Sequence, residues 1–426
     1  MKEVFAKRRT LTLKRGKERV VANRHPWIFT GAIHGGHGPE DAAFADLVDG
    51  AGRSIASGFH SRHSQIRMRA LTFGADELTS DLIVSRLVRS IGRRAPLFDD
   101  ATNAARLVHA EGDDLSSIVI DRYADVLVVE ISNHGAEEIK PLLVETLRRE
   151  LAPRLIYFKN DLPARKIEQL GLVDEILGAD PIVEPGSVVE EDDEVEDSET
   201  QALHSTTRRP DATTGDTKTQ ILESGLRFVV DPREGQKTGF FLDQRENRRL
   251  AGSLSADRRV LNLFSYTGAF GVYAAAGGAS FVRNVDISAK AIEVARENHA
   301  LNGSTAEHTV ADAFQFVRSS SERYDLLICD PPAFAKSRGE VDRAARGYKD
   351  VNLHAMRMIE RGGHMLTFSC SGHMSLDLFQ KVIFAAALDA GRQISIIRRL
   401  TAGVDHPVSL FCPEGEYLKG FLLEVH

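Results

Sequence analysis

The chain of 426 residues is long enough for two or three domains, and its 42% hydrophobic and 27% charged content is that of a soluble globular protein. It has no apolar run of about 18 residues, and its start, MKEVFAKRRT, lacks the apolar stretch of a signal peptide. Cys329, Cys370 and Cys412 show neither a pairing pattern nor metal-ligand spacing. We therefore expect a cytoplasmic protein without a membrane partner or a bound metal.

The formal net charge of −7 is unevenly distributed. Residues 184–220 hold eleven acidic and three basic side chains, a net charge of −8, whereas residues 1–73 hold thirteen basic and six acidic side chains, a net charge of +7. A basic segment is the usual footprint of contact with a phosphate backbone, although a merely solvated surface has the same composition.

Residues 1–75 alternate short apolar runs with glycine turns, which predicts a small, mostly β unit. Lys14, Arg15 and Lys17 flank a glycine there and are candidate contacts to substrate RNA. Trp27 lies in the run HPWIF, either as a core anchor or as a platform for base stacking. The motifs L-K-x-G-K-E, H-P-W-I-F and V-D-G-x-G resemble those of a PUA domain, an RNA-binding barrel.

Residues 76–183 are expected to form a middle α/β domain that also binds RNA. Apolar spacing predicts helices over residues 78–91 and 137–151 and strands over 106–110, 117–121, 126–131 and 155–159. The acids within residues 109–123 fit either catalysis or a turn after a strand. Residues 184–220 are too acidic and too poor in apolar side chains to bury a core, so we expect a disordered linker, either regulatory or simply solvated.

Residues 221–426 show the strand–helix alternation of a doubly wound sheet. After an initial hairpin, residues 260–286 read as a strand, a glycine turn, a helix and a strand ending at Asp286, where a ribose-binding acid belongs. Only Gly268 and Gly271 match part of G-x-G-x-x-G, which disfavours a dinucleotide. An adenosine ligand without phosphates, such as S-adenosylmethionine (SAM), fits better; a purely structural turn is the alternative.

Seven strands with a terminal hairpin are typical of the methyltransferase variant of this fold. The remaining pattern predicts strands over residues 307–310, 324–330, 363–369, 393–400 and 418–425, and helices over 288–301, 344–359 and 376–390. Thr267, Asp286, Asp312 and Asp330 all fall at the carboxyl ends of strands, the edge where such sheets bind ligands. We therefore expect a Rossmann-like α/β domain with its site at this edge.

A second group of candidate donor contacts precedes the sheet. Asp243 and Glu246 have the spacing of a capping box, which predicts a helix starting at Asp243. Gln244 and Arg245 would then lie on its first turn, with Arg245 able to bind a carboxylate through two hydrogen bonds. Alternatively, the arginines of this segment simply coat a helix.

Two motifs suggest the chemistry. Asp330, Pro331, Pro332 and Phe334 belong to DPPAF, which resembles the [DNS]-P-P-[YFW] motif of methyltransferases; the prolines make a rigid turn, and the Phe334 ring is suited to stacking on a flipped base. Cys370, in FSCSG after the next strand, is a candidate nucleophile or a buried small residue. A thiolate that adds to carbon 6 of a pyrimidine activates carbon 5 for methylation.

Taken together, the segments GQKTGFFLDQR, NLFSYTGAF, DPPAF, RGYKD, FSCSGHMS and DHPV----EGEYLKGF are similar to those of the bacterial 23S rRNA cytosine-C5 methyltransferase family. The resemblance implies a PUA domain, a middle α/β domain and a class I methyltransferase domain, with SAM as methyl donor, 23S rRNA as substrate and a homodimer as one possible state. It implies Cys370 as nucleophile and these donor contacts: Gln244, Arg245, Phe264, Tyr266, Thr267, Gly268, Asp286, Asp312 and Asp330.

The sequence departs from that family at two places. The acidic segment 184–220 is an insertion, and we expect deletion of residues 190–216 to spare activity. Many RNA cytosine-C5 enzymes carry a second cysteine after the motif proline, but Pro332 is followed here by Ala333, which leaves the final proton acceptor open, with Asp330 as one candidate. Methylation of a base nitrogen and a non-catalytic role in RNA binding are the alternative functions.

Overall fold

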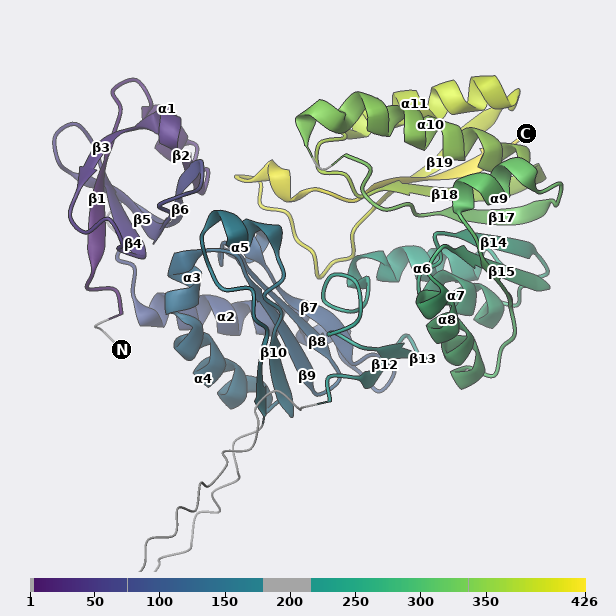
Figure 1. Cartoon of the computed structure of the whole chain (residues 1–426), viewed down its shortest axis with the longest axis horizontal. Helices are drawn as coiled ribbons and strands as arrows, with labels where there is room; N and C mark the ends of the chain where they lie inside the picture. The colour runs from purple at the N-terminus through teal and green to yellow at the C-terminus, as the bar shows by residue number, and fades with distance from the viewer. Residues whose placement is uncertain (1–3, 75, 179–215, 336) are drawn as a thin grey trace, which may run out of the picture.

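The computed structural model describes residues 4–74, 76–178, 216–335 and 337–426, which form three units in a row (Figure 1). The expected acidic linker lies mostly outside the described residues. Among the described residues, no helix is both long and apolar enough to cross a bilayer.

The first unit is a six-stranded sheet in the order β2-β6-β5-β4-β1-β3, curled into a barrel (Figure 1). Alternate side chains of its strands, such as Leu11, Leu47 and Met68, fill the interior, as expected for strands with one buried face. Its elements are β1 (Arg8–Leu13), α1 (Glu18–Ala22), β2 (Trp27–Phe29), η1 (Thr30–Ala32), β3 (Ile33–His37), β4 (Phe44–Val48), β5 (Ser54–His60) and β6 (Ile66–Phe73).

The middle unit is a five-stranded sheet in the order β11-β10-β9-β8-β7. Its two faces belong to two different cores: Leu127 and Val129 of β9 pack with the helices and with Phe59 of the barrel, whereas Val126 and Val128 pack against the third unit. The elements are α2 (Ser80–Arg94), η2 (Ala95–Leu97), β7 (Ala104–His109), η3 (Ala110–Asp113), β8 (Ile118–Tyr123), β9 (Val126–Ile131), α3 (His134–Glu138), α4 (Lys140–Leu151), β10 (Leu155–Phe158), α5 (Pro163–Ile167) and β11 (Glu175–Gly178).

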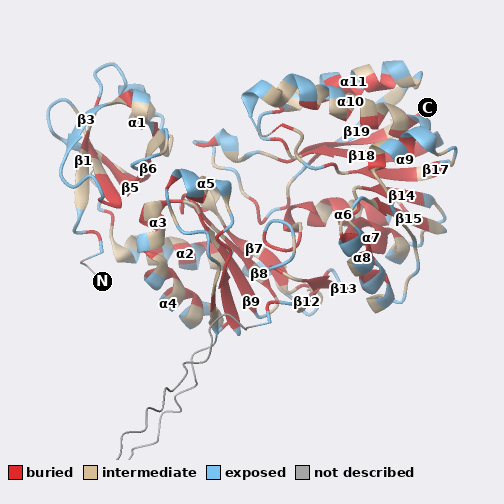
Figure 2. Ribbon diagram, viewed as in Figure 1, coloured by how far each residue is buried: buried red, intermediate tan, exposed pale blue. Residues whose placement is uncertain are grey.

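The third unit begins with a hairpin and continues into a seven-stranded sheet in the order β16-β15-β14-β17-β18-β20-β19, with β20 antiparallel to both neighbours. This confirms the expected Rossmann-like fold with a terminal hairpin. Helices α6 to α8 cover one face and α9 to α11 the other, and the buried positions follow the sheet (Figures 1 and 2).

The elements of this third unit are as follows: β12 (Thr219–Glu223), β13 (Leu226–Val230), η4 (Leu242–Gln244), α6 (Arg245–Ser253), β14 (Arg259–Leu263), α7 (Ala269–Ala276), β15 (Phe281–Asp286), α8 (Ala289–Leu301), β16 (Glu307–Val310), α9 (Ala313–Ser319), β17 (Tyr324–Cys329), η5 (Arg338–Glu340), α10 (Val341–Arg357), β18 (Ile359–Ser369), α11 (Leu376–Ala390), β19 (Ile394–Thr401), η6 (Pro413–Gly415) and β20 (Lys419–Val425).

Three local predictions were wrong. The helix expected over residues 137–151 is broken at Ile139, because Pro141 lacks a backbone N–H and is placed in the first turn of a new helix, α4. Strand β12 starts at Thr219, inside the segment expected to be linker. The capping box does not form: η4 precedes α6, Gln244 is the N-cap of α6 without a side-chain cap bond, and Asp243 lies in η4, buried.

Candidate active site

The turn after β14 is shaped for close contact with a ligand. Phe264 and Tyr266 have φ values of 55° and 47°, and Gly268 has a φ of 77°. A Cβ at Gly268 would lie 2.8 Å from the Cβ of Ala295, so helix α8 packs against the turn too tightly for a side chain there. The hydroxyl of Thr267 is buried without a hydrogen-bond partner among the described residues, which leaves it available to a ligand.

Asp286, at the end of β15, is held by this turn. Its two carboxylate oxygens accept hydrogen bonds from the backbone N–H groups of Tyr266 (2.8 Å) and Ser288 (2.9 Å). Each oxygen keeps a second lone pair, so the carboxylate can still accept from ribose hydroxyls. Gly271 has a different role from the one suggested by the partial glycine motif: a Cβ there would lie 2.4 Å from Oδ1 of Asn284, so it allows α7 to pack on β15.

Asp312, at the third strand end, is the N-cap of α9, where Oδ1 accepts from the backbone N–H of Gln315 at 2.9 Å. Asp330 accepts a hydrogen bond of 3.0 Å from Nε2 of Gln244, which brings two predicted residues from distant segments together. Burial and the negative charge of Asp243 raise the pKa of Asp330 to about 7, although the hydrogen bond from Gln244 opposes the shift. Near neutral pH this carboxyl group therefore exists in both protonation states.

Cys370 lies beside the DPPAF turn. Its Sγ is 3.8 Å from the carbonyl oxygen of Pro331. Burial and the charge of Asp330 raise the pKa of the thiol to about 11, while Lys237 acts in the opposite direction. In the free protein Cys370 is therefore a thiol, and its reaction requires a proton transfer or added positive charge.

Hydrogen bonds fix the two motifs against each other. Oγ of Ser371 accepts from the backbone N–H of Ala335 at 3.2 Å and lies 3.0 Å from the hydroxyl of Tyr348. Lys419 donates to the carbonyl oxygens of Ser371 (2.9 Å) and Met374 (2.7 Å). These bonds determine how far Cys370 lies from the proline turn.

The other residues of DPPAF differ in exposure. Pro331 is buried, whereas Pro332 is exposed to solvent. Phe334 is half-buried, with its ring centroid 4.5 Å from that of Tyr348 and 5.7 Å from that of Phe314. The Phe334 ring is thus already part of an aromatic cluster, and only its exposed portion is free to contact a base.

The prediction that Arg245 contacts the methyl donor needs correction. The side chain is buried, and Nη2 donates to the carbonyl oxygen of Ala104 (2.8 Å) and to Oδ2 of Asp405 (3.1 Å). Glu223 also lies within ion-pair distance, at 3.5 Å. Arg245 therefore points toward the middle unit, and the carboxylates beside it belong to the chain, while its Nε and Nη1 have no hydrogen-bond partner among the described residues.

The sequence analysis missed a charged group at the same edge. The ammonium of Lys237 lies 4.6 Å from the ring centroid of Phe241 and 3.4 Å from Oδ2 of Asp243, which also accepts a 2.6 Å hydrogen bond from the hydroxyl of Tyr417. Burial alone would raise the pKa of Asp243, but Lys237, His406 and Tyr417 outweigh it and lower the pKa. Lys237 lies in GQKTG and Tyr417 in EGEYLKGF, which are parts of the segments that resemble the methyltransferase family.

The predicted RNA contacts Lys14, Arg15 and Lys17 are all solvent-exposed on the barrel, in the segment between β1 and α1. Lys14 donates to the carbonyl oxygen of Gly31 at 3.1 Å. Trp27 is half-buried and donates from Nε1 to Glu111 of the middle unit at 2.8 Å, so it joins two units.

The sheet order and the polar groups at its carboxyl edge define a SAM-dependent methyltransferase. The family description "S-adenosylmethionine-dependent methyltransferase" matches residues 209–383, and "PUA-like domain" matches residues 11–73. Two solved structures share the fold over 98% of this chain and 100% of theirs: a protein from Streptococcus mutans assigned as a SAM-dependent methyltransferase (TM-score 0.75, 20% identity), and one assigned as a methyltransferase and complexed with SAH (TM-score 0.76, 20% identity).

Among curated proteins, the chain is 39% identical to ribosomal RNA large subunit methyltransferase I of Shewanella denitrificans, over 97% of this chain and 99% of that protein. It is also 39% identical to the protein of the same name from Tolumonas auensis, over 97% and 98% of the two chains. The chain belongs to the ribosomal RNA large subunit methyltransferase I family.

Proposed function

We propose that this protein methylates carbon 5 of a cytosine in large-subunit ribosomal RNA through a covalent adduct with Cys370. The observation that carries this proposal is the position of the Cys370 sulfur, 3.8 Å from the carbonyl of Pro331 and beside Asp330 at the carboxyl edge of the sheet. The names of the curated relatives support ribosomal RNA as the substrate.

The residues at the carboxyl ends of the strands are suited to binding the methyl donor SAM. Asp286 offers acceptors for ribose hydroxyls, and the unpartnered hydroxyl of Thr267 and the turn at Gly268 suit a ligand held close to the backbone. Phe264, Tyr266 and Asp312 adjoin the same edge, and Gln244 reaches it through Asp330. When bound there, SAM supplies an electrophilic methyl group.

Cys370 and Asp330 have different roles in the reaction: Cys370 is the nucleophile and Asp330 the proton donor. Carbon 5 of a pyrimidine is a poor nucleophile until a sulfur adds to carbon 6. Protonated Asp330, well populated at neutral pH because its pKa is about 7, donates its proton to ring nitrogen 3, which makes carbon 6 electrophilic. The Cys370 thiol loses its proton to solvent, the thiolate sulfur forms a bond to carbon 6, and the electron pair of the 5,6 double bond becomes available at carbon 5.

After methylation the covalent adduct is resolved. The proton on carbon 5 leaves to a base, the bond between sulfur and carbon 6 breaks, and nitrogen 3 returns its proton to Asp330. Lys237 is the cation that favours the thiolate form of Cys370 during both addition and release. Pro332 and Phe334 line the turn that would receive the base.

The test supplies SAM with a labelled methyl group and unmodified large-subunit rRNA, followed by digestion and identification of the labelled nucleoside. We expect label in 5-methylcytidine with the wild type and with the Cys412→Ala control, and none with Cys370→Ala although this variant still binds SAM. RNA containing 5-fluorocytosine should form a denaturant-resistant complex that requires Cys370.

Two results would overturn the proposal. Label in another nucleoside that persists in Cys370→Ala would indicate methylation of a base nitrogen, which needs no thiolate. A wild-type protein that binds RNA but neither binds SAM nor transfers label would indicate a non-catalytic role in RNA binding.

A further inference from the structure

A cavity of about 290 Å³ lies where the three units of the chain meet. Its walls come from the barrel, from the middle unit and from the loop that joins β19 to β20, residues 402–418, which we call the crossing loop. Figure 1 shows this loop, in yellow, extending from the third unit toward the barrel. The cavity is separate from the strand-end site, because none of its lining residues belongs to that site.

Two hydrogen-bond donors of the barrel line this cavity without a partner among the described residues. Thr72 is 3% exposed, and its hydroxyl makes no hydrogen bond. Arg24 is exposed, has a φ of 52°, and its guanidinium has neither a hydrogen bond nor an ion pair within the described ranges. A buried hydroxyl without a partner is costly, so its position in a polar cavity indicates a bound group.

Acceptors come from the middle unit. Oε1 of Glu111 accepts from Nε1 of Trp27 (2.8 Å) and from Oγ of Ser116 (2.5 Å), which leaves Oε2 for another donor. Arg86 does not compete for it, because its guanidinium donates to the carbonyl oxygens of Leu71 (2.6 Å) and Asp114 (2.8 Å). Because Asp76 and Asp114 also line it, the cavity presents free donors together with several carboxylate acceptors to the same occupant.

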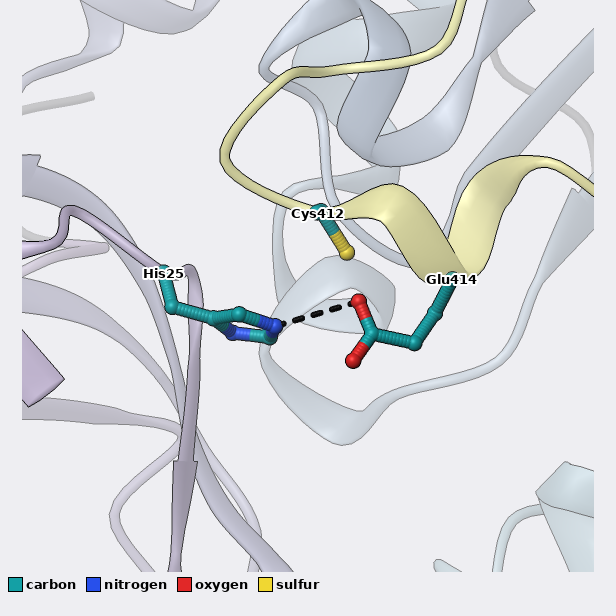
Figure 3. A group of neighbouring side chains, drawn as sticks. All are labelled: His25, Cys412 and Glu414. Atoms are coloured by element: carbon teal, nitrogen blue, oxygen red, sulfur yellow. Dashed lines mark hydrogen bonds and ion pairs between the residues drawn. The ribbon is translucent and has the colours of Figure 1, made fainter.

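The crossing loop adds an aromatic ring. Phe411 lines the cavity and is 52% exposed, so part of its ring is open to a ligand. The loop is held beside the barrel by a 3.2 Å contact between Nε2 of His25 and Oε2 of Glu414, with the buried Cys412 next to it (Figure 3).

His25, Cys412 and Glu414 are close enough to act as metal ligands, since their possible ligand atoms lie within 4.8 Å of one another. Nδ1 of His25 accepts from the backbone N–H of Trp27 at 3.1 Å, which leaves the ring proton on Nε2, facing Glu414. Burial and the charges of Glu111 and Glu414 raise the pKa of the Cys412 thiol to about 12. The ring proton on Nε2 of His25 and the protonated thiol of Cys412 both disfavour metal binding. The cluster is therefore better explained as a hydrogen-bonded contact that positions the crossing loop.

We propose that this cavity binds one unpaired nucleotide of the substrate RNA, away from the base that is methylated. The proposal rests on the proposed function in taking RNA as the substrate. A nucleobase has an aromatic face for Phe411 and edges that both donate and accept, and its phosphate is the natural partner of the free Arg24. The volume is near the lower end of the roughly 300–1,000 Å³ of ligand pockets, which suits one nucleotide.

The test measures binding of unmodified large-subunit rRNA without SAM, so that it does not depend on methyl transfer. Phe411→Ala removes the stacking ring, and Arg24→Asn removes the charge while tolerating the positive φ. We expect about tenfold weaker RNA binding for Phe411→Ala and, for Arg24→Asn, a salt dependence reduced by about one phosphate contact. Matched controls are Phe384→Ala on α11, where the ring is 64% exposed, and Arg361→Gln on β18.

A photo-crosslinking amino acid at position 411, with position 384 as control, tests the occupant directly. A crosslink from 411 to one rRNA nucleotide, absent from 384, is the expected result. Equal RNA binding by both cavity variants and the wild type, or no crosslink from position 411 to the rRNA, would overturn the nucleotide site. Weaker RNA binding by the variants together with no label in cytosine would instead refute the cytosine chemistry and leave the nucleotide site standing.

Discussion

Replacing Asp330 by Asn should stabilise the protein at alkaline pH while it impairs methylation. Burial and the nearby charge of Asp243 raise the pKa of Asp330 from 3.8 to about 7. A carboxyl group whose pKa is higher in the folded than in the unfolded protein lowers the free energy of unfolding once the pH exceeds the unfolded value, and the loss is complete above the folded value. Asn cannot ionise, and its side-chain oxygen can still accept the hydrogen bond of Gln244.

The size of the effect follows from the two pKa values. With 1.36 kcal/mol per pKa unit, ionisation of Asp330 lowers the free energy of unfolding by roughly 2 kcal/mol at pH 5 and about 4 kcal/mol at pH 8. The advantage of the variant should thus grow by about 2–3 kcal/mol between these pH values. At about 2–4 °C per kcal/mol for a domain of this size, the difference in Tm should widen by roughly 5–10 °C.

Thermal melts of wild type and Asp330→Asn at unit steps from pH 5 to pH 8 measure this difference. The change with pH is the decisive quantity, because any constant gain or loss from the altered hydrogen bond cancels. Asp312→Asn, which keeps the N-cap of α9, controls for the loss of one carboxyl group at the same edge. A difference in Tm between Asp330→Asn and wild type that stays constant from pH 5 to pH 8 would refute the reasoning.

Three further outcomes follow from the same geometry. Gly271→Ala should destabilise the protein by about 1–3 kcal/mol, seen as a lower Tm, because the new Cβ would lie 2.4 Å from Oδ1 of Asn284; an unchanged Tm would show that the helix shifts freely. Arg248→Met should cost about 3–5 kcal/mol in urea denaturation, because Glu223 loses hydrogen bonds of 2.7 Å to Nε and Nη2, and Glu223→Gln in the same chain should restore part of the loss. Alkylation of Cys370 by iodoacetamide in the free protein should keep rising from pH 8 to pH 10, because its pKa is about 11; a plateau near pH 8 would contradict this.

Much of the site could be predicted because it depends on short-range features. Asp286 is the last residue of β15 and Asp330 directly follows β17, and parallel strands bring such ends to one edge of the sheet. The proximity of Cys370 and Pro331, 39 residues apart, was predictable for the same reason, because β17 and β18 are parallel neighbours. The helix predicted over residues 376–390 coincides with α11, since Ser375 caps it and Gly391 ends it with a φ of 66°.

The failures concern residues whose partners are far away in the sequence. Arg245 has the side chain to bind a ligand carboxylate, but its partner Asp405 comes 160 residues later, in the crossing loop. Asp243 has the spacing of an N-cap, yet Tyr417 and Lys237 bind its carboxylate. Local sequence patterns predict which kinds of group such side chains can bind. Which group they do bind depends on how the units pack.

The packing would also keep the proposed nucleotide site at a fixed distance from Cys370. The sheet of the middle unit shares one core with the barrel, through Phe59, and the other with the third unit, through Phe228. The crossing loop adds a buried connection, because the carboxylate of Asp405 accepts from the backbone N–H of Arg106 at 2.9 Å as well as from Arg245. Breaking that connection would leave a buried charge without partners, which is far more costly than losing a surface contact such as His25–Glu414. The cavity and the Cys370 sulfur therefore belong to one continuous packed structure, so RNA bound at the proposed nucleotide site would have a defined position relative to the strand ends.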